Sequence, residues 1–101
     1  MNQTVTCGST HNLPRFPLGQ VVATPGALAL LERYGLSAST FLARHVRGDW
    51  GDVPPEDAAA NDQAITGGHR VLSAYSVGDA RIWIISEWDR SVTTVLMPSE
   101  Y

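Results

Sequence analysis

Three short stretches of the chain combine side-chain types that enzymes use for acid–base chemistry. The first is His45-Val-Arg-Gly-Asp-Trp-Gly-Asp52, at the end of an expected helix. A histidine can act as a general base, an arginine can stabilise an oxyanion, and a carboxylate such as Asp49 or Asp52 can orient the histidine. The same residues also fit a salt-bridged helix end, in which the helix dipole favours a charged His45 and Trp50 fills the core.

The second stretch is Glu87-Trp-Asp-Arg-Ser91, at an expected turn between two strands. Turns often display functional groups. A large aromatic such as Trp88 at a turn is suited to anchor a binding partner. Asp89 can instead cap the turn or pair with Arg90, which would be structural roles.

The third stretch begins at His69 and Arg70 and continues as an expected strand. Side chains two residues apart lie on the same face of a strand, so His69 shares its face with Ser73 and Tyr75. This face either lines a site or is the solvated face of an edge strand.

The sequence predicts neither a metal site nor a cofactor. His45 and Asp49 have a spacing that helical metal ligands use, but Gly48 interrupts the helix between them. The chain contains no Walker loop, GxGxxG, HExxH or CxxC pattern. Its single cysteine, Cys7, excludes an internal disulfide and a cysteine-based metal site, and we expect it to be an incidental thiol.

Composition predicts one globular domain in the cytoplasm. The chain has 101 residues, of which 44% are hydrophobic and 17% charged. Its longest strongly apolar run, residues 82–85, is far shorter than the roughly 18 residues of a membrane span. The first residues lack the basic and apolar regions of a secretory signal.

The charge pattern favours a protein partner over nucleic acid. The formal net charge is −3, and all seven basic residues are arginine. A net negative chain is poorly suited to nonspecific binding of phosphates. Residues 49–62 contain five of the ten acids and no base; the five are Asp49, Asp52, Glu56, Asp57 and Asp62.

The elements that must position these groups predict an α+β domain. We expect an N-terminal flexible arm over residues 1–19 and a domain over residues 20–101. Capping signals predict helices over 25–34 and 38–47, and residues 55–65 favour a third, so we expect two to three helices. Strand patterns follow over 69–76, 81–87 and 91–97, with a short candidate strand at 20–22. Helices followed by strands indicate a three- to four-stranded antiparallel meander, with residues 81–87 central because both faces are apolar.

Three segments carry a resemblance to a known family: residues 18–27, 45–52 and 81–101. They resemble a family of small, uncharacterised proteins encoded on bacterial plasmids and integrative elements. The resemblance spans about residues 16–101. It implies a mobile genetic element as the setting and brings no activity.

A weaker likeness links the order of elements to the barnase–RelE group of small ribonucleases and toxins. Residues 81–97 look like the hairpin that carries catalytic residues in barnase-type enzymes. Those enzymes typically have a histidine there and are basic, whereas this hairpin has no histidine and the chain is acidic. The likeness therefore bears on the fold more than on the chemistry.

Three functions remain open from the sequence. The favoured hypothesis is a non-enzymatic protein-binding accessory factor of a mobile element, for example an anti-CRISPR or anti-restriction protein. Its expected contact residues are Asp49, Trp50, Asp52, Glu56, Asp57, Trp88, Asp89 and Arg90. The alternative is a metal-independent ribonuclease or relic toxin with His45 or His69 as base and Arg70 or Arg90 stabilising the phosphorane. The third is a structural dimer module that pairs through an edge strand.

Overall fold

The computed structural model describes residues 13–101 and confirms the α+β class. The expected order of helices before the main strands is also confirmed. The elements are β2 (Gln20–Ala23), α1 (Pro25–Arg33), α2 (Ala38–Val46), α3 (Pro55–Gly67), β3 (Val71–Val77), β4 (Ala80–Ser86), β5 (Val92–Leu96) and the short 3-10 helix η2 (Pro98–Glu100). Cys7 and most of the expected arm lie outside the described residues.

The four strands form one sheet in the order β2-β5-β4-β3. β4 pairs with a strand on each side, as its apolar faces predicted. The expectation of a purely antiparallel sheet is wrong, because β2 runs parallel to β5. Three helices and two strands separate β2 from β5, so the chain has ample length to enter the sheet again in the same direction; only a short hairpin would force antiparallel pairing.

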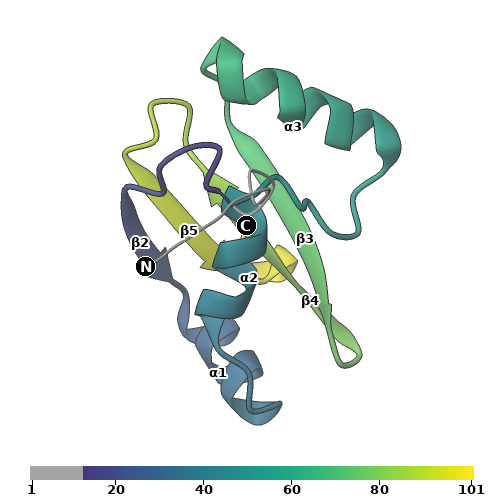
Figure 1. The fold of residues 1–101 in the computed structure, drawn as a ribbon. Helices are drawn as coiled ribbons and strands as arrows, with labels where there is room; N and C mark the ends of the chain where they lie inside the picture. Colours follow the sequence, from purple (N-terminus) through teal and green to yellow (C-terminus); the bar gives the residue numbers. More distant parts are fainter. Residues whose placement is uncertain (1–12) are drawn as a thin grey trace, which may run out of the picture.

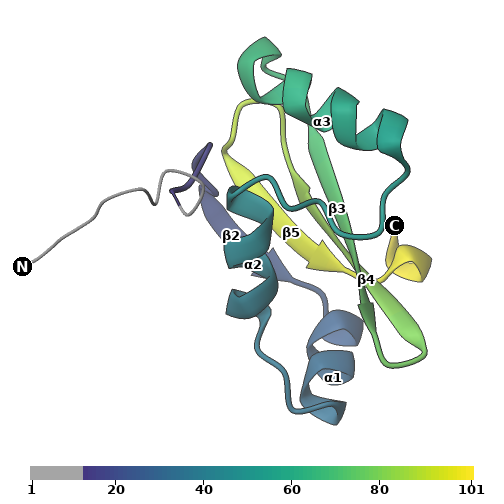
Figure 2. The same cartoon turned by 45° about the vertical axis from the view of Figure 1, so that its right-hand side comes forward.

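The three helices lie at different positions relative to the sheet. In Figure 1, α1 lies beyond the end of the sheet where β2 and β5 finish, and α3 lies near the opposite end beside β3. Figure 2 shows α2 on one side of the sheet and the C-terminal η2 on the other. The turn between β4 and β5 is at the same end as α3.

Local capping explains where α1 begins. Thr24 is the N-cap, and its side chain accepts a hydrogen bond from the Ala27 N–H at 3.2 Å. Pro25 fits the first helical position because its missing N–H would have no partner there. The Glu100 carboxylate accepts the Gly26 N–H at 3.0 Å and also bonds Thr24. The C-terminal segment is thereby fastened to the first turn of α1.

The core has two clusters, and the larger lies between α1, α2 and the sheet. Its larger cluster contains Ala27, Leu30, Leu31, Phe41, Tyr75, Val77, Ile82, Ile84 and Val95. A second cluster joins Phe16, Trp50, Ala64 and Val71. Phe16 is buried, and the Arg15 N–H donates to the Val46 carbonyl at 2.7 Å. Residues 15–16, which the sequence predicts as part of the flexible arm, thus pack against the domain.

The outer edge of β3 is closed by two different devices. The Asn61 side-chain amide donates to the Leu72 carbonyl at 2.8 Å and accepts the Leu72 N–H at 3.2 Å, so it takes the place of a neighbouring strand. Two residues along, the Ala74 N–H donates to the Trp50 carbonyl and the Ala74 carbonyl accepts the Asp52 N–H. Both capped residues have their N–H and their carbonyl directed away from β4 and satisfied.

Removing the Asn61 amide should weaken the domain measurably. In Asn61→Ala, the Leu72 N–H and carbonyl lose the hydrogen bonds that the buried Asn61 side chain makes with them. Because these backbone groups are left without partners, the free energy of unfolding should fall by about 2 kcal/mol. Gln63→Ala, on the exposed side of the same helix, is the control and should change it by less than about 0.5 kcal/mol. Urea unfolding followed by circular dichroism measures both. Equal stability of the two variants would contradict the bridging role.

Candidate functional site

The centre of the molecule contains a chain of buried polar side chains that begins at His45. Its imidazole Nδ1 is 2.6 Å from the Ser73 hydroxyl, and Nε2 is 2.9 Å from the Ser86 hydroxyl. Ser86 is 2.6 Å from the Thr93 hydroxyl, which donates to the Leu18 carbonyl at 2.7 Å. All four side-chain members are fully buried. The chain joins α2 to three strands and to the segment before β2.

The number of available protons determines which group donates in each hydrogen bond of this series. Each hydroxyl has one proton, and Thr93 uses its proton on the Leu18 carbonyl, so Thr93 accepts from Ser86. Ser86 must then accept from His45, which places the imidazole proton on Nε2. Nδ1 is left as the acceptor of the Ser73 hydroxyl. Both ring nitrogens of a neutral His45 are satisfied.

Burial, together with a smaller effect of the nearby Arg90 guanidinium, lowers the pKa of His45 to about 4. The expectation that the helix dipole keeps His45 charged is therefore not met: loss of hydration outweighs the dipole. A neutral imidazole with no exposed surface and two committed nitrogens cannot take a proton from a substrate in this arrangement. His45 is a structural element of the core.

Arg90 is half-buried, and its guanidinium is held by hydrogen bonds within the protein. Its guanidinium donates to three carbonyls, those of His69 at 2.7 Å, Glu87 at 2.8 Å and Ala64 at 2.9 Å. It also lies over the Phe16 ring. The backbone has a φ of 58°, which is unusual for a residue other than glycine. Arg90 therefore ties the β4–β5 turn to the C-terminal end of α3.

The other two residues of the nuclease hypothesis point elsewhere. His69 is exposed, and its main chain closes the end of α3 by donating to Ala64. The Arg70 guanidinium donates to the Tyr101 hydroxyl at 2.8 Å and pairs with Glu87 at 3.5 Å. The face expected to hold His69, Ser73 and Tyr75 is not solvated, because Ser73 and Tyr75 are buried against the core.

The 49–52 segment is mainly structural. Trp50 is 5% exposed, so the core encloses this expected contact residue, and its indole donates to Asp62 at 3.1 Å. The Asp49 carboxylate takes a two-point contact from Arg44, at 2.7 and 3.3 Å, and this hydrogen-bonded arginine lowers the pKa of Asp49. Gly51 meets Ala74 so closely that a Cβ would strike the Ala74 carbonyl, which explains glycine at this position.

The five acids of residues 49–62 do not form a uniform acidic surface. Asp49 pairs with Arg44, and Asp62 pairs with Arg15 at 3.2 Å. Asp52 is exposed and accepts the Ser76 hydroxyl at 2.6 Å. Glu56 and Asp57 are exposed in the first turn of α3. We call Asp52, Glu56 and Asp57 the acidic strip.

Trp88 is the most exposed tryptophan of the chain, with 65% of its surface accessible. The turn that carries it is closed by Asp89, whose carboxylate accepts the Ser91 N–H at 3.1 Å and the Ser91 hydroxyl at 2.7 Å. These bonds lower the pKa of Asp89. Of the two roles expected for Asp89, the structure shows the turn cap.

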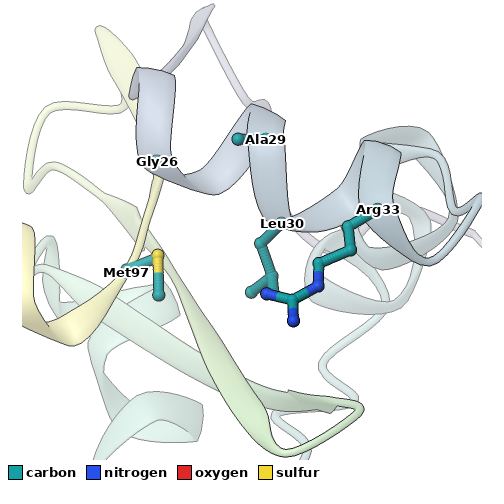
Figure 3. A pocket seen from close by; sticks show the side chains of 5 residues that line it. All are labelled: Gly26, Ala29, Leu30, Arg33 and Met97. Carbon is teal, nitrogen blue, oxygen red and sulfur yellow. The ribbon is translucent and has the colours of Figure 1, made fainter.

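A shallow hollow lies between α1 and the end of β5, and no sequence pattern predicts it. It is lined by Gly26, Ala29, Leu30, Arg33 and Met97 (Figure 3). Its volume of about 210 Å³ is below the roughly 300–1,000 Å³ of small-molecule sites. Arg33 is the single charged side chain in it, so the hollow lacks the convergent groups of a catalytic centre.

Within residues 13–101, no three histidine, cysteine or acidic side chains come together as a metal site. In the same part of the chain, no helix is long and apolar enough to cross a membrane. Comparison with protein-family models, with curated proteins and with solved structures finds no match to this chain.

Proposed function

We propose that this protein is a non-enzymatic binding factor whose contact surface runs along α3 from the acidic strip to Trp88. The observation that carries the proposal is the exposure of Trp88 on a turn held in one shape. Tryptophan is among the residues that most often dominate binding energy in protein interfaces. Nothing in the fold of residues 13–101 requires an indole at this exposed position.

The turn is preorganised, which reduces the entropy that binding must overcome. The Asp89 carboxylate accepts two hydrogen bonds from Ser91 within the turn. The Arg90 guanidinium donates hydrogen bonds to three backbone carbonyls. In this proposal Asp89 and Arg90, expected from the sequence as contact residues, act mainly by holding the turn that presents Trp88.

α3 connects the two ends of this surface. Its thirteen residues span about 20 Å, with Glu56 and Asp57 in the first turn and the Arg90 anchor at the Ala64 carbonyl near the last. Of its side chains, only Asn61 and Ala64 are buried, and Ala59 and Ala60 face solvent. Small side chains allow another protein to approach the helix closely. The acidic strip would attract a basic partner and orient it.

The chemistry of this surface fits a partner that itself binds nucleic acid. Such proteins expose basic faces, which the acidic strip complements. Together with the resemblance to proteins of plasmids and integrative elements, this supports an accessory factor of a mobile element. The anti-defence role against a CRISPR or restriction complex is the specific form of the proposal.

The experiment is a pull-down of the tagged protein from lysate of a bacterial host, with and without nuclease treatment. A stoichiometric, nuclease-resistant partner should be retained by the wild type. Trp88→Ala should weaken its binding at least about 30-fold, because exposed tryptophan anchors contribute about 2 kcal/mol or more. The triple variant Asp52→Lys, Glu56→Lys, Asp57→Lys should lower the association rate, most strongly at low salt.

Two matched variants control for surface changes in general. Leu28→Ala removes an apolar side chain that is 53% exposed on α1, and Asp79→Lys reverses an exposed acid at the β3–β4 turn. Both should bind the partner like the wild type. Retention of the partner by Trp88→Ala would contradict the proposed surface, and degradation of RNA by the purified wild type would favour the nuclease instead.

A further inference from the structure

The two edges of the sheet are treated differently. The β3 edge is closed by Asn61 and by the 50–52 segment. At the other edge, within residues 13–101, no strand pairs with the outer side of β2. In Figure 1, β2 forms the left-hand margin of the sheet.

The register of β2 shows which of its groups face outward. The Gln20 N–H donates to the Ser91 carbonyl and the Thr24 N–H to the Val95 carbonyl, so even-numbered residues face β5. In a parallel ladder the alternate residues face away from the neighbouring strand. The N–H and carbonyl of Val21 and of Ala23 therefore point outward.

This edge is short, but it lacks the charges and the proline that normally prevent pairing. Lysine, proline, a bulge or an inward-pointing charge usually protects an exposed edge strand. β2 reads Gln-Val-Val-Ala, with no charge and no proline. Val21 and Val22 are 44% and 40% exposed, one on each face of the sheet.

We infer that β2 pairs antiparallel with β2 of a second copy of this chain, joining two four-stranded sheets across a two-fold axis. An axis perpendicular to the sheet keeps the faces of both copies aligned, so residues of the same parity lie opposite each other. Centring the axis on Val22 places each Val21 opposite Ala23 of the other copy. All four outward groups of each strand then form hydrogen bonds, four in total across the axis.

The side chains also suit this arrangement. Val22 faces its own symmetry mate at the closely spaced, non-hydrogen-bonded position, where β-branched pairs pack well. No like charges meet, because the strand has none. A second copy is a fitting occupant because it brings the same open edge with complementary spacing. An interface based on four residues a side belongs to the small, transient class, so the dimer should depend on concentration.

Two variants of the full-length chain test the pairing. Val21→Pro removes an outward N–H without breaking a bond to β5, and by symmetry it deletes two of the four bonds across the axis. Sedimentation velocity over a wide range of micromolar concentrations should show the wild type dimerising. The dissociation constant should rise at least about tenfold in Val21→Pro. The control is Ser39→Ala, a change at an exposed position on α2.

The second test does not depend on the stability of the proline variant. In a Cys7→Ser background, Val22→Cys should form a covalent dimer on mild oxidation, since Cα atoms about 4.5 Å apart across the axis suit a disulfide. Leu28→Cys, at a position on α1 that is even more exposed, should remain a monomer.

A wild type that stays monomeric without cross-linking at Val22→Cys would overturn the inference. So would a dimer that Val21→Pro leaves unchanged. If the wild type is monomeric and binds a different protein that Val21→Pro no longer retains, the β2 edge is the binding site of that protein and the dimer inference is wrong. Because Trp88 and the acidic strip lie outside β2, failure here is distinguishable from failure of the proposed binding surface.

Discussion

Replacing His45 with alanine should lower the free energy of unfolding by about 4 kcal/mol, a large share of the 5–15 kcal/mol typical of a domain. The change removes a fully buried ring and leaves a cavity between α2 and the sheet. It also orphans the Ser73 hydroxyl donor and leaves the Ser86 hydroxyl without the proton it accepts. The loss combines a packing cost with unsatisfied polar groups, which is why we expect it to exceed that of an ordinary surface histidine.

The control is His69→Ala, a histidine of the same chain that is exposed. It should change the free energy of unfolding by less than about 0.5 kcal/mol. Urea titrations monitored by tryptophan fluorescence and circular dichroism give both values. If His45→Ala unfolds entirely, His45→Gln keeps the test open, since its amide can restore one of the two hydrogen bonds and should fall between alanine and wild type. A loss below about 1 kcal/mol in His45→Ala would contradict the network.

Local signals in the sequence were sufficient to predict the helices. The capping signals are Thr24-Pro25 for α1 and Ser37 for α2, and Gly68 ends α3 in the left-handed conformation. The apolar character of both faces of residues 81–87 correctly placed β4 in the middle of the sheet. These features depend on neighbours in the sequence or on a period of two, and a single sequence contains both.

The parallel strand could not be predicted in the same way. Residues 20–22 read as a short strand, but whether they join β3 or β5, and in which direction, depends on the path of α1 and α2. No nearby residue encodes that choice. The mixed sheet is a property of the whole topology.

The structural roles of the candidate catalytic residues could not be predicted from the sequence, because side-chain type does not show which residues form hydrogen bonds with each other in the fold. His45 and Ser86 are 41 residues apart, and Arg90 reaches a helix carbonyl 26 residues away. These long-range bonds turn apparent catalytic residues into structural ones. Trp88 is exposed because a tight polar turn offers it no core to enter, and its role as an anchor for a partner stays a prediction.

Acid should destabilise the protein through His45. In the unfolded chain His45 has the ordinary pKa of about 6.5, whereas burial and Arg90 lower the pKa of the folded state to about 4. Between these values the unfolded chain binds a proton that the folded protein does not, so stability falls as the pH falls. The contribution of His45 to stability should be constant above about pH 6.5, decline through this window by about 3 kcal/mol in total, and level off below it.

The decline has a structural origin that the His45→Gln variant isolates. A proton on Nδ1 would face the Ser73 hydroxyl, which already donates to that nitrogen, and it would place a second positive charge near Arg90. Glutamine cannot titrate, so urea midpoints of the variant should be flat from pH 7.5 to about 4.5. The pKa values of Asp49, Asp89 and Glu100 are lowered in the folded protein, so their contribution is lost only at more acidic pH. A wild-type midpoint that does not change between pH 7 and 4.5, or an equal slope in the variant, would show that His45 is not the group responsible.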